Sequence, residues 1–137
     1  MDIQTGLLLP AIVQALMVLA LSYTMGISRF VSARSGKVDM REVVKTGKWP
    51  GKLGVLSDSF NNQFQMPQIF YVVCIILTLL GEVAQTNIII AWLFVALRFV
   101  HMIWHNTKNI VIIRFILFVL SGTALTVLVI KALLAML

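Results

Sequence analysis

The sequence predicts an all-α integral membrane protein, a bundle of four transmembrane helices in a single domain over residues 1–137. Two observations carry this prediction. Hydrophobic residues make up 60% of the chain and charged residues only 12%, with a mean hydropathy of +0.98, whereas soluble domains carry roughly 25% charged residues. The apolar residues are also gathered in four stretches, at residues 7–27, 67–80, 88–104 and 110–137.

The first helix is expected at residues 5–29. Pro10 falls near its first turn, where a proline is tolerated or bends the helix slightly. The only charge before the apolar stretch is Asp2, and a secretory signal peptide would need a basic segment there. We therefore expect a retained membrane helix. The single cysteine, Cys74, lies within a later apolar stretch, which excludes an intrachain disulfide.

The second apolar stretch, residues 67–80, is shorter than the roughly 17 to 25 residues that span a bilayer. It reaches that length only if its helix includes the polar residues that precede it. We therefore expect one continuous helix at residues 56–80, which ends at Gly81. The third and fourth helices are expected at residues 88–105 and 110–136. Short turns connect the last three helices, which predicts antiparallel neighbours.

Basic residues are concentrated between the first and second helices, where only Asp39 and Glu42 offset them. They are Arg29, Arg34, Lys37, Arg41, Lys45, Lys48 and Lys52. Positive residues stay on the cytoplasmic side of a membrane, so we expect a cytoplasmic loop at residues 30–55. Contact with anionic lipid headgroups accounts for this charge. We therefore expect membrane lipids, and no nucleic acid, as partners.

The main functional signal is a set of polar residues inside otherwise apolar helices. They recur three or four residues apart on the second and third helices, and one lies just inside the fourth. The set comprises Asp58, Asn61, Asn62, Gln65, Gln68, Arg98, His101, His105 and Arg114. At a rise of 1.5 Å per residue, all lie in the cytoplasmic half of the bundle. Such groups usually face a bundle interior or a wet cavity, and we hypothesise that three helices share one polar crevice.

Other interpretations of single residues remain open at this point. Asn62 and Gln65 can serve only as hydrogen-bonding contacts between packed helices. Arg98 can pair with Asp58 to stabilise a buried charge. Arg114 lies close enough to a helix end to reach the membrane interface with its guanidinium.

Metal binding and transport have less support. His101 and His105 lie on one face of one helix without a nearby third ligand, which is a weak zinc site. They cannot be opposite axial ligands of one haem, because they project from the same face. No acidic relay crosses the outer half of the bundle, as a proton pathway would require. We expect no metal.

Two motifs resemble those of the MAPEG family, the membrane-associated proteins of eicosanoid and glutathione metabolism. Residues 62–67, Asn-Gln-Phe-Gln-Met-Pro, are similar to the family's Asn-x-x-Glu followed shortly by Pro. Arg98, His101, His105 and Arg114 have the spacing of the Arg, His, Tyr and Arg of the prostaglandin E synthase branch. Small bacterial members carry a similar Asn-Gln-Phe-acid-x-Pro stretch. The resemblance thus implies a bacterial-type member in an inner membrane.

This resemblance implies a left-handed four-helix bundle assembled as a homotrimer. Glutathione would lie between neighbouring subunits near the cytoplasmic face, and a lipophilic electrophile would approach from the bilayer. Carried over by position, Asn62 and Gln65 would hold the glutathione peptide. The same pocket would be lined by Arg98, His101 and His105. Arg114 corresponds to the arginine that stabilises the thiolate, since a nearby cation lowers the pKa of a thiol.

Departures from the family pattern leave two functional hypotheses. Gln65 replaces an acid that would pair with the ammonium group of glutathione, and Asp58 stands where the enzymes place an arginine. His105 and Phe118 stand at tyrosine positions. Arg114 favours a glutathione-dependent transferase or peroxidase acting on lipophilic electrophiles. Asp58 and Gln65 favour a non-catalytic scaffold that binds lipid or protein.

A charge from the first loop is one way to offset these losses. Glutathione carries two carboxylates, and the second helix lacks the basic residues that would bind them. Arg29 or Arg34 is placed in the sequence where it can supply a replacement.

Overall fold

The computed structural model describes residues 5–137, which form six helices and no strand. Four stretches are long and apolar enough to cross a membrane, and the second of them combines three of these helices. This confirms the predicted all-α fold with four membrane spans. The helices are α1 (Leu8–Arg34), α2 (Met40–Thr46), α3 (Gly51–Asn62), α4 (Met66–Leu79), α5 (Gln85–Asn106) and α6 (Val111–Met136).

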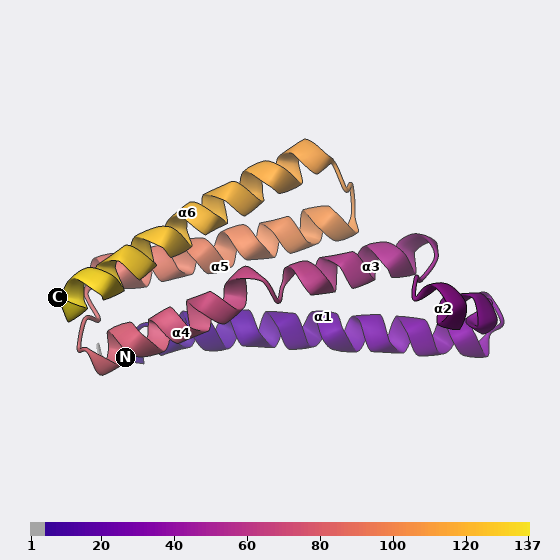
Figure 1. Cartoon of the computed structure of the whole chain (residues 1–137), viewed down its shortest axis with the longest axis horizontal. Coiled ribbons are helices and arrows are strands. Elements are labelled where there is room, and N and C mark those ends of the chain that lie inside the picture. The colour runs from indigo at the N-terminus through magenta and orange to yellow at the C-terminus, as the bar shows by residue number, and fades with distance from the viewer. Residues whose placement is uncertain (1–4) are drawn as a thin grey trace.

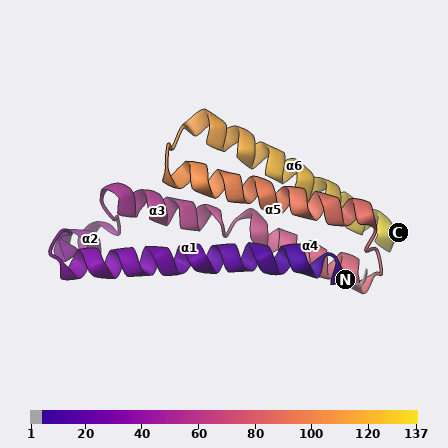
Figure 2. The same cartoon turned by 180° about the vertical axis from the view of Figure 1, so that it is seen from behind.

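The helices run lengthwise beside one another in an elongated bundle (Figure 1). α3 and α4 follow one another along α1, while α5 and α6 form a hairpin beside them. The start of α1 and the end of α6 lie at one end of the bundle, and α2 lies at the other (Figure 2). There, α1 and α3 extend past the α5–α6 turn.

α1 is longer than the sequence predicted, because it continues to Arg34 and not to residue 29. Its 27 residues correspond to about 40 Å of helix, which exceeds the roughly 30 Å of a hydrocarbon core. The basic side chain in the last turn suits the negative end of the helix dipole. One narrow face of α1 is buried, at Pro10, Gln14, Met17 and Leu21.

The prediction of one continuous helix at residues 56–80 is wrong. The segment begins earlier, at Gly51, and is interrupted at residues 63–65, between α3 and α4. Pro67 lies in the first turn of α4. A proline has no N–H for the carbonyl four residues before it, here that of Gln63, and its ring clashes with that carbonyl. The break is the local consequence of this proline.

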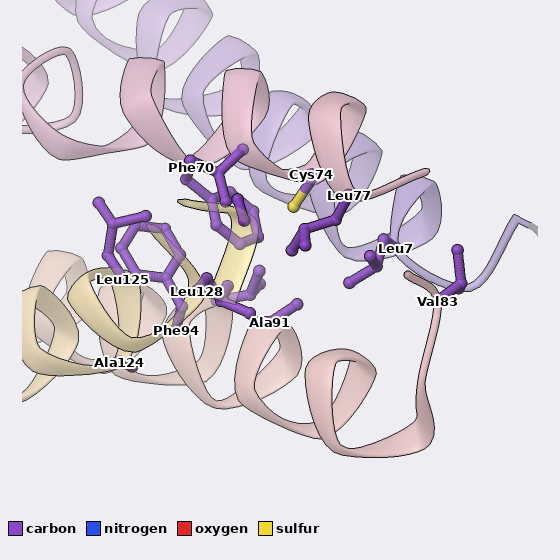
Figure 3. Packing of buried hydrophobic residues seen from close by; sticks show 13 residues of the cluster. Leu7, Phe70, Cys74, Leu77, Val83, Ala91, Phe94, Ala124, Leu125 and Leu128 are labelled. Carbon is purple, nitrogen blue, oxygen red and sulfur yellow. The ribbon is translucent and has the colours of Figure 1, made fainter. Parts of the chain in front are cut away.

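The apolar core lies where α4, α5 and α6 meet Leu7, just before α1 (Figure 3). It occupies the half of the bundle that holds the start of α1 and the end of α6. Phe70 of α4 stacks on Phe94 of α5, with ring centroids 4.3 Å apart. Small residues such as Ala91 and Ala124 allow the helices to approach closely. Cys74 is fully buried in this core as a free thiol. The polar residues that line the candidate site described below lie nearer α2 than this core.

Candidate functional site

A hollow of about 200 Å³ opens between α3, α5 and α6 in the half of the bundle nearer α2. Its lining residues are Asn62, His101, Val111, Arg114, Phe115 and Phe118. One amide, one imidazole and one guanidinium thus meet three apolar side chains. Three of the residues that the sequence assigned to a site, Asn62, His101 and Arg114, share this hollow.

Arg114 is held in place by the turn that precedes α6. Its Nη1 donates a hydrogen bond to the Asn109 side-chain oxygen at 2.7 Å. Asn109 has a backbone φ of 51°, a left-handed conformation that asparagine tolerates better than most residues. The side chain reaches toward the end of the span, as expected of a basic residue one turn inside a membrane. It is half-buried and also lines the hollow.

His101 is the most deeply buried polar side chain of the hollow, with 2% of its surface exposed. His105 follows one turn later on α5, also buried, and its ring meets that of His101 edge to face, with centroids 5.9 Å apart. His105 does not line the hollow. Residues 5–137 contain no group of three or more His, Cys, Asp or Glu side chains arranged to hold a metal.

Arg98 precedes His101 by one turn on α5 and is fully buried. Its Nη2 donates a hydrogen bond of 2.6 Å to the backbone carbonyl of Asn62, the last residue of α3. Asp58 is exposed on α3, so the pairing that forms is not the Arg98–Asp58 ion pair that the sequence allowed. Arg98 therefore links α5 to the end of α3 and is not among the lining residues.

The polar stripe expected on the second span is not formed as the sequence suggested. Gln65 lies in the break, is exposed and does not line the hollow. Asn61 and Gln68 are exposed as well. The stripe assumed a continuous helix, in which side chains advance by about 100° per residue. The three non-helical residues at 63–65 change the phase between α3 and α4.

The break turns Gln63 inward, a residue to which the sequence pattern gives no role. Its Oε1 accepts a hydrogen bond of 3.3 Å from Nε2 of Gln14 on α1, and both side chains are buried. Gln14 is the one carboxamide within the first apolar stretch, which was the available signal. A second missed contact joins Ser59 to Asn106, whose Nδ2 donates at 2.8 Å.

Arg29 is occupied at the end of the bundle near α2. Its Nη2 donates to the Ser57 hydroxyl at 2.6 Å, and its guanidinium lies 4.7 Å from the ring centroid of Trp49. Cation–π and hydrogen-bond contacts therefore direct this charge toward α3 and the loop before it. Arg34 is exposed at the end of α1. Neither arginine lines the hollow.

Four stretches long and apolar enough to cross a membrane, with a partly polar hollow between three of their helices, define a multi-pass integral membrane protein. The chain belongs to the MAPEG family, whose family model matches residues 7–134. The match covers nearly the whole chain, including every residue of the hollow. The family includes glutathione transferases and peroxidases as well as non-catalytic members. Comparison with curated proteins and with solved structures found no match.

Proposed function

We propose that this protein is a glutathione-dependent transferase or peroxidase that acts on lipophilic electrophiles. The observation that carries the proposal is the meeting of Arg114, His101 and Asn62 in one hollow beside Phe115 and Phe118. MAPEG members commonly use glutathione. A cation, an imidazole and an amide suit a polar thiol ligand, and the aromatic side chains suit an apolar second substrate.

In this proposal Arg114 is the catalytic residue. A guanidinium beside the glutathione sulfur lowers the thiol pKa and raises the fraction of nucleophilic thiolate. The effect is larger in a low-dielectric hollow than in water. The thiolate attacks an electrophilic carbon, a C–S bond forms, and the leaving group departs with its bonding electrons, while the thiol proton passes to water. With a hydroperoxide, the thiolate attacks the outer oxygen, the O–O bond breaks, and the alkoxide leaves and takes up a proton to give the alcohol. A second glutathione then displaces the hydroxyl from the resulting sulfenic acid as water, and the disulfide forms.

The size of the hollow bears on the assembly. At about 200 Å³ it is smaller than the roughly 300 to 1,000 Å³ of typical small-molecule pockets. Glutathione, a tripeptide, would extend beyond it. We therefore propose a homotrimer in which a neighbouring subunit completes the pocket, and in which the exposed Gln65 contacts the extended part of the ligand. His105 supports His101 from within α5.

The proposed setting is a bacterial inner membrane with the loop at residues 30–55 in the cytoplasm. The support is the run of basic residues in this loop, which is typical of cytoplasmic segments. Membrane lipids would contact the large apolar side chains exposed along the helices. A lipophilic substrate dissolved in the bilayer would approach the hollow past Val111 and Phe115, which are both exposed.

A non-catalytic lipid-binding scaffold is the second candidate. A wholly apolar groove of about 490 Å³ lies between α1 and α5, lined in part by Met17, Trp92 and Phe99. A groove of this character suits an acyl chain. Arg29 is engaged with Ser57 and Trp49, so this chain does not bring that charge to the hollow to replace the missing carboxylate-binding residues.

The deciding experiment is a titration of the purified protein in detergent with glutathione, followed by the ultraviolet absorbance of the thiolate. We expect the wild type to bind and to show this absorbance, and Arg114→Gln to lose it. Arg34→Gln removes the same charge from an exposed position and should behave as the wild type. No binding at about 1 mM glutathione, already a weak affinity, would contradict the enzymatic proposal and favour the scaffold.

A further inference from the structure

We propose that Arg98 is a positioning residue, which caps the C-terminal end of α3 and thereby holds Asn62 in place beside the hollow. In this assignment its guanidinium does not contact the ligand. The capping of α3 is independent of the proposed function, whereas the effect of this capping on glutathione affinity rests on that function.

The break leaves the last carbonyl groups of α3 without the helical donors that a continuous helix would supply. Two of these carbonyls find backbone donors in the break itself. The Gln63 N–H donates a hydrogen bond to the Phe60 carbonyl at 2.9 Å, and the Phe64 N–H donates one to the Asn61 carbonyl at 3.1 Å. The following carbonyl, that of Asn62, accepts the Nη2 donor of Arg98 at 2.6 Å. Arg98 thus caps a third carbonyl at the end of α3 from another helix.

The charge of Arg98 suits this place. The C-terminal end of a helix carries a partial negative charge, which a cation stabilises. Hydrogen bonds from a charged donor are shorter and stronger than neutral ones. A fully buried arginine within a membrane span is costly and is retained where it has a function. Its partner here is a helix end and not a carboxylate, and this bond engages Nη2 alone, because Nε and Nη1 are buried without a hydrogen-bond partner among the described residues.

Capping of α3 by Arg98 also determines the geometry of the hollow. Asn62 lines the hollow, and so does His101, which lies one turn after Arg98 on α5. The bond from Arg98 therefore fixes the end of α3 relative to the helix face that carries His101. A second bond between the same helices, from Asn106 to Ser59 at 2.8 Å, lies nearer the α5–α6 turn. It should hold α3 on α5 when the bond from Arg98 is removed.

The first test is backbone hydrogen exchange in detergent over residues 60–68. Removal of a charge-assisted bond to a helix end should speed exchange at Gln63 and Phe64 by about tenfold in Arg98→Gln. Arg98→Lys keeps one charged donor and should exchange more like the wild type than like Arg98→Gln. Unchanged exchange in Arg98→Gln, or equal acceleration in both variants, would overturn the assignment.

If Arg98→Gln fails to fold, nitrogen NMR of the Arg98 guanidinium in the wild type tests the capping role instead. An Arg98 Nη–H that exchanges slowly with water, and whose shift does not change at saturating glutathione, supports a capping role. Rapid exchange with free rotation, or a large shift on addition of glutathione, overturns it.

The second test separates positioning from contact with the thiol. In Arg98→Gln the affinity for glutathione should fall by about tenfold, while the thiolate absorbance per bound glutathione stays as in the wild type, because Arg114 is intact. Loss of absorbance per bound molecule would instead make Arg98 a contact residue. If the wild type binds no glutathione, the proposed function fails, and hydrogen exchange alone decides the role of Arg98.

Discussion

At the scale of residues, a few hydrogen bonds between side chains and neighbouring helices hold the polar part of this bundle together. The Gln14–Gln63 pair joins α1 to the break, and Arg98 joins α5 to the end of α3. Within the described residues, Gln14 Oε1 and Gln63 Nε2 have no protein partner. Each of these amides therefore relies on one bond, so that removal of one partner leaves the other unpaired.

Replacement of Gln14 by leucine should destabilise the protein. Gln63 would keep its buried amide without a partner, which costs about 1 to 3 kcal/mol. Unfolding in a graded mixture of mild and denaturing detergent measures this. Gln68→Leu, at an exposed position on α4, is the matched control and should leave stability nearly unchanged.

The paired replacement sharpens this test. When both partners are replaced by apolar residues, no amide is left unpaired, so Gln14→Leu combined with Gln63→Leu should be more stable than Gln14→Leu alone. A double variant that is as unstable as the sum of its single variants would show that the two amides do not act as a pair.

At the scale of elements, the interruption between α3 and α4 decides which polar residues face inward. The proline rule explains its position, because Pro67 cannot donate to the Gln63 carbonyl. The break directs Gln63 into the bundle and leaves Gln65 exposed. It also exposes the Asn62 carbonyl to Arg98.

Pro67→Ala should partly repair the break. The new N–H can donate to the Gln63 carbonyl and the ring clash disappears, so backbone exchange at residues 63–67 should become slower. Because the Asn62 carbonyl would then bond within the helix and Gln63 would turn away from Gln14, the end of α3 should shift and glutathione affinity should fall as well. Hydrogen exchange and the thiolate titration measure the two effects.

Pro10→Ala is the control for this prediction, since Pro10 lies in the first turns of α1, where a proline costs little. It should leave exchange at residues 63–67 as in the wild type. A Pro67→Ala variant with unchanged exchange would show that tertiary contacts, and not the proline, maintain the break.

At the scale of the whole molecule, the apolar core lies toward the start of α1 and the end of α6, whereas the hollow lies nearer α2. The hollow lies at the α3–α5–α6 junction with exposed apolar residues on its rim. It is too small for a tripeptide. A neighbouring subunit is the source we propose for the missing wall.

Chemical crosslinking in mild detergent should therefore give a trimer as the largest abundant species. The same reaction after transfer to denaturing detergent should give monomer, which controls for random collision. A monomer under both conditions would contradict the assembly and leave the hollow as the full extent of the site.

The sequence predicted some of these features residue by residue and missed others. Arg98, His101 and His105 fall on one buried face of α5, as their spacing of three and four residues suggested. Asn62 and Gln65 were placed on one stripe, yet only Asn62 lines the hollow. The error came from reading a helical period through Pro67. A single amide in an apolar stretch, such as Gln14, has no periodic partner, so the sequence pattern does not assign it a role.

By itself the sequence determined the membrane fold and the number of spans, because the burial of long apolar stretches in lipid depends on composition and length. It also carried the motifs that indicate the MAPEG family. Only the tertiary structure decided which polar groups meet, since a three-residue interruption changes the direction of every side chain beyond it. The tertiary structure also decided that Arg98 donates to a backbone carbonyl. Every residue has such an acceptor, so the pattern of side chains cannot predict which one is used.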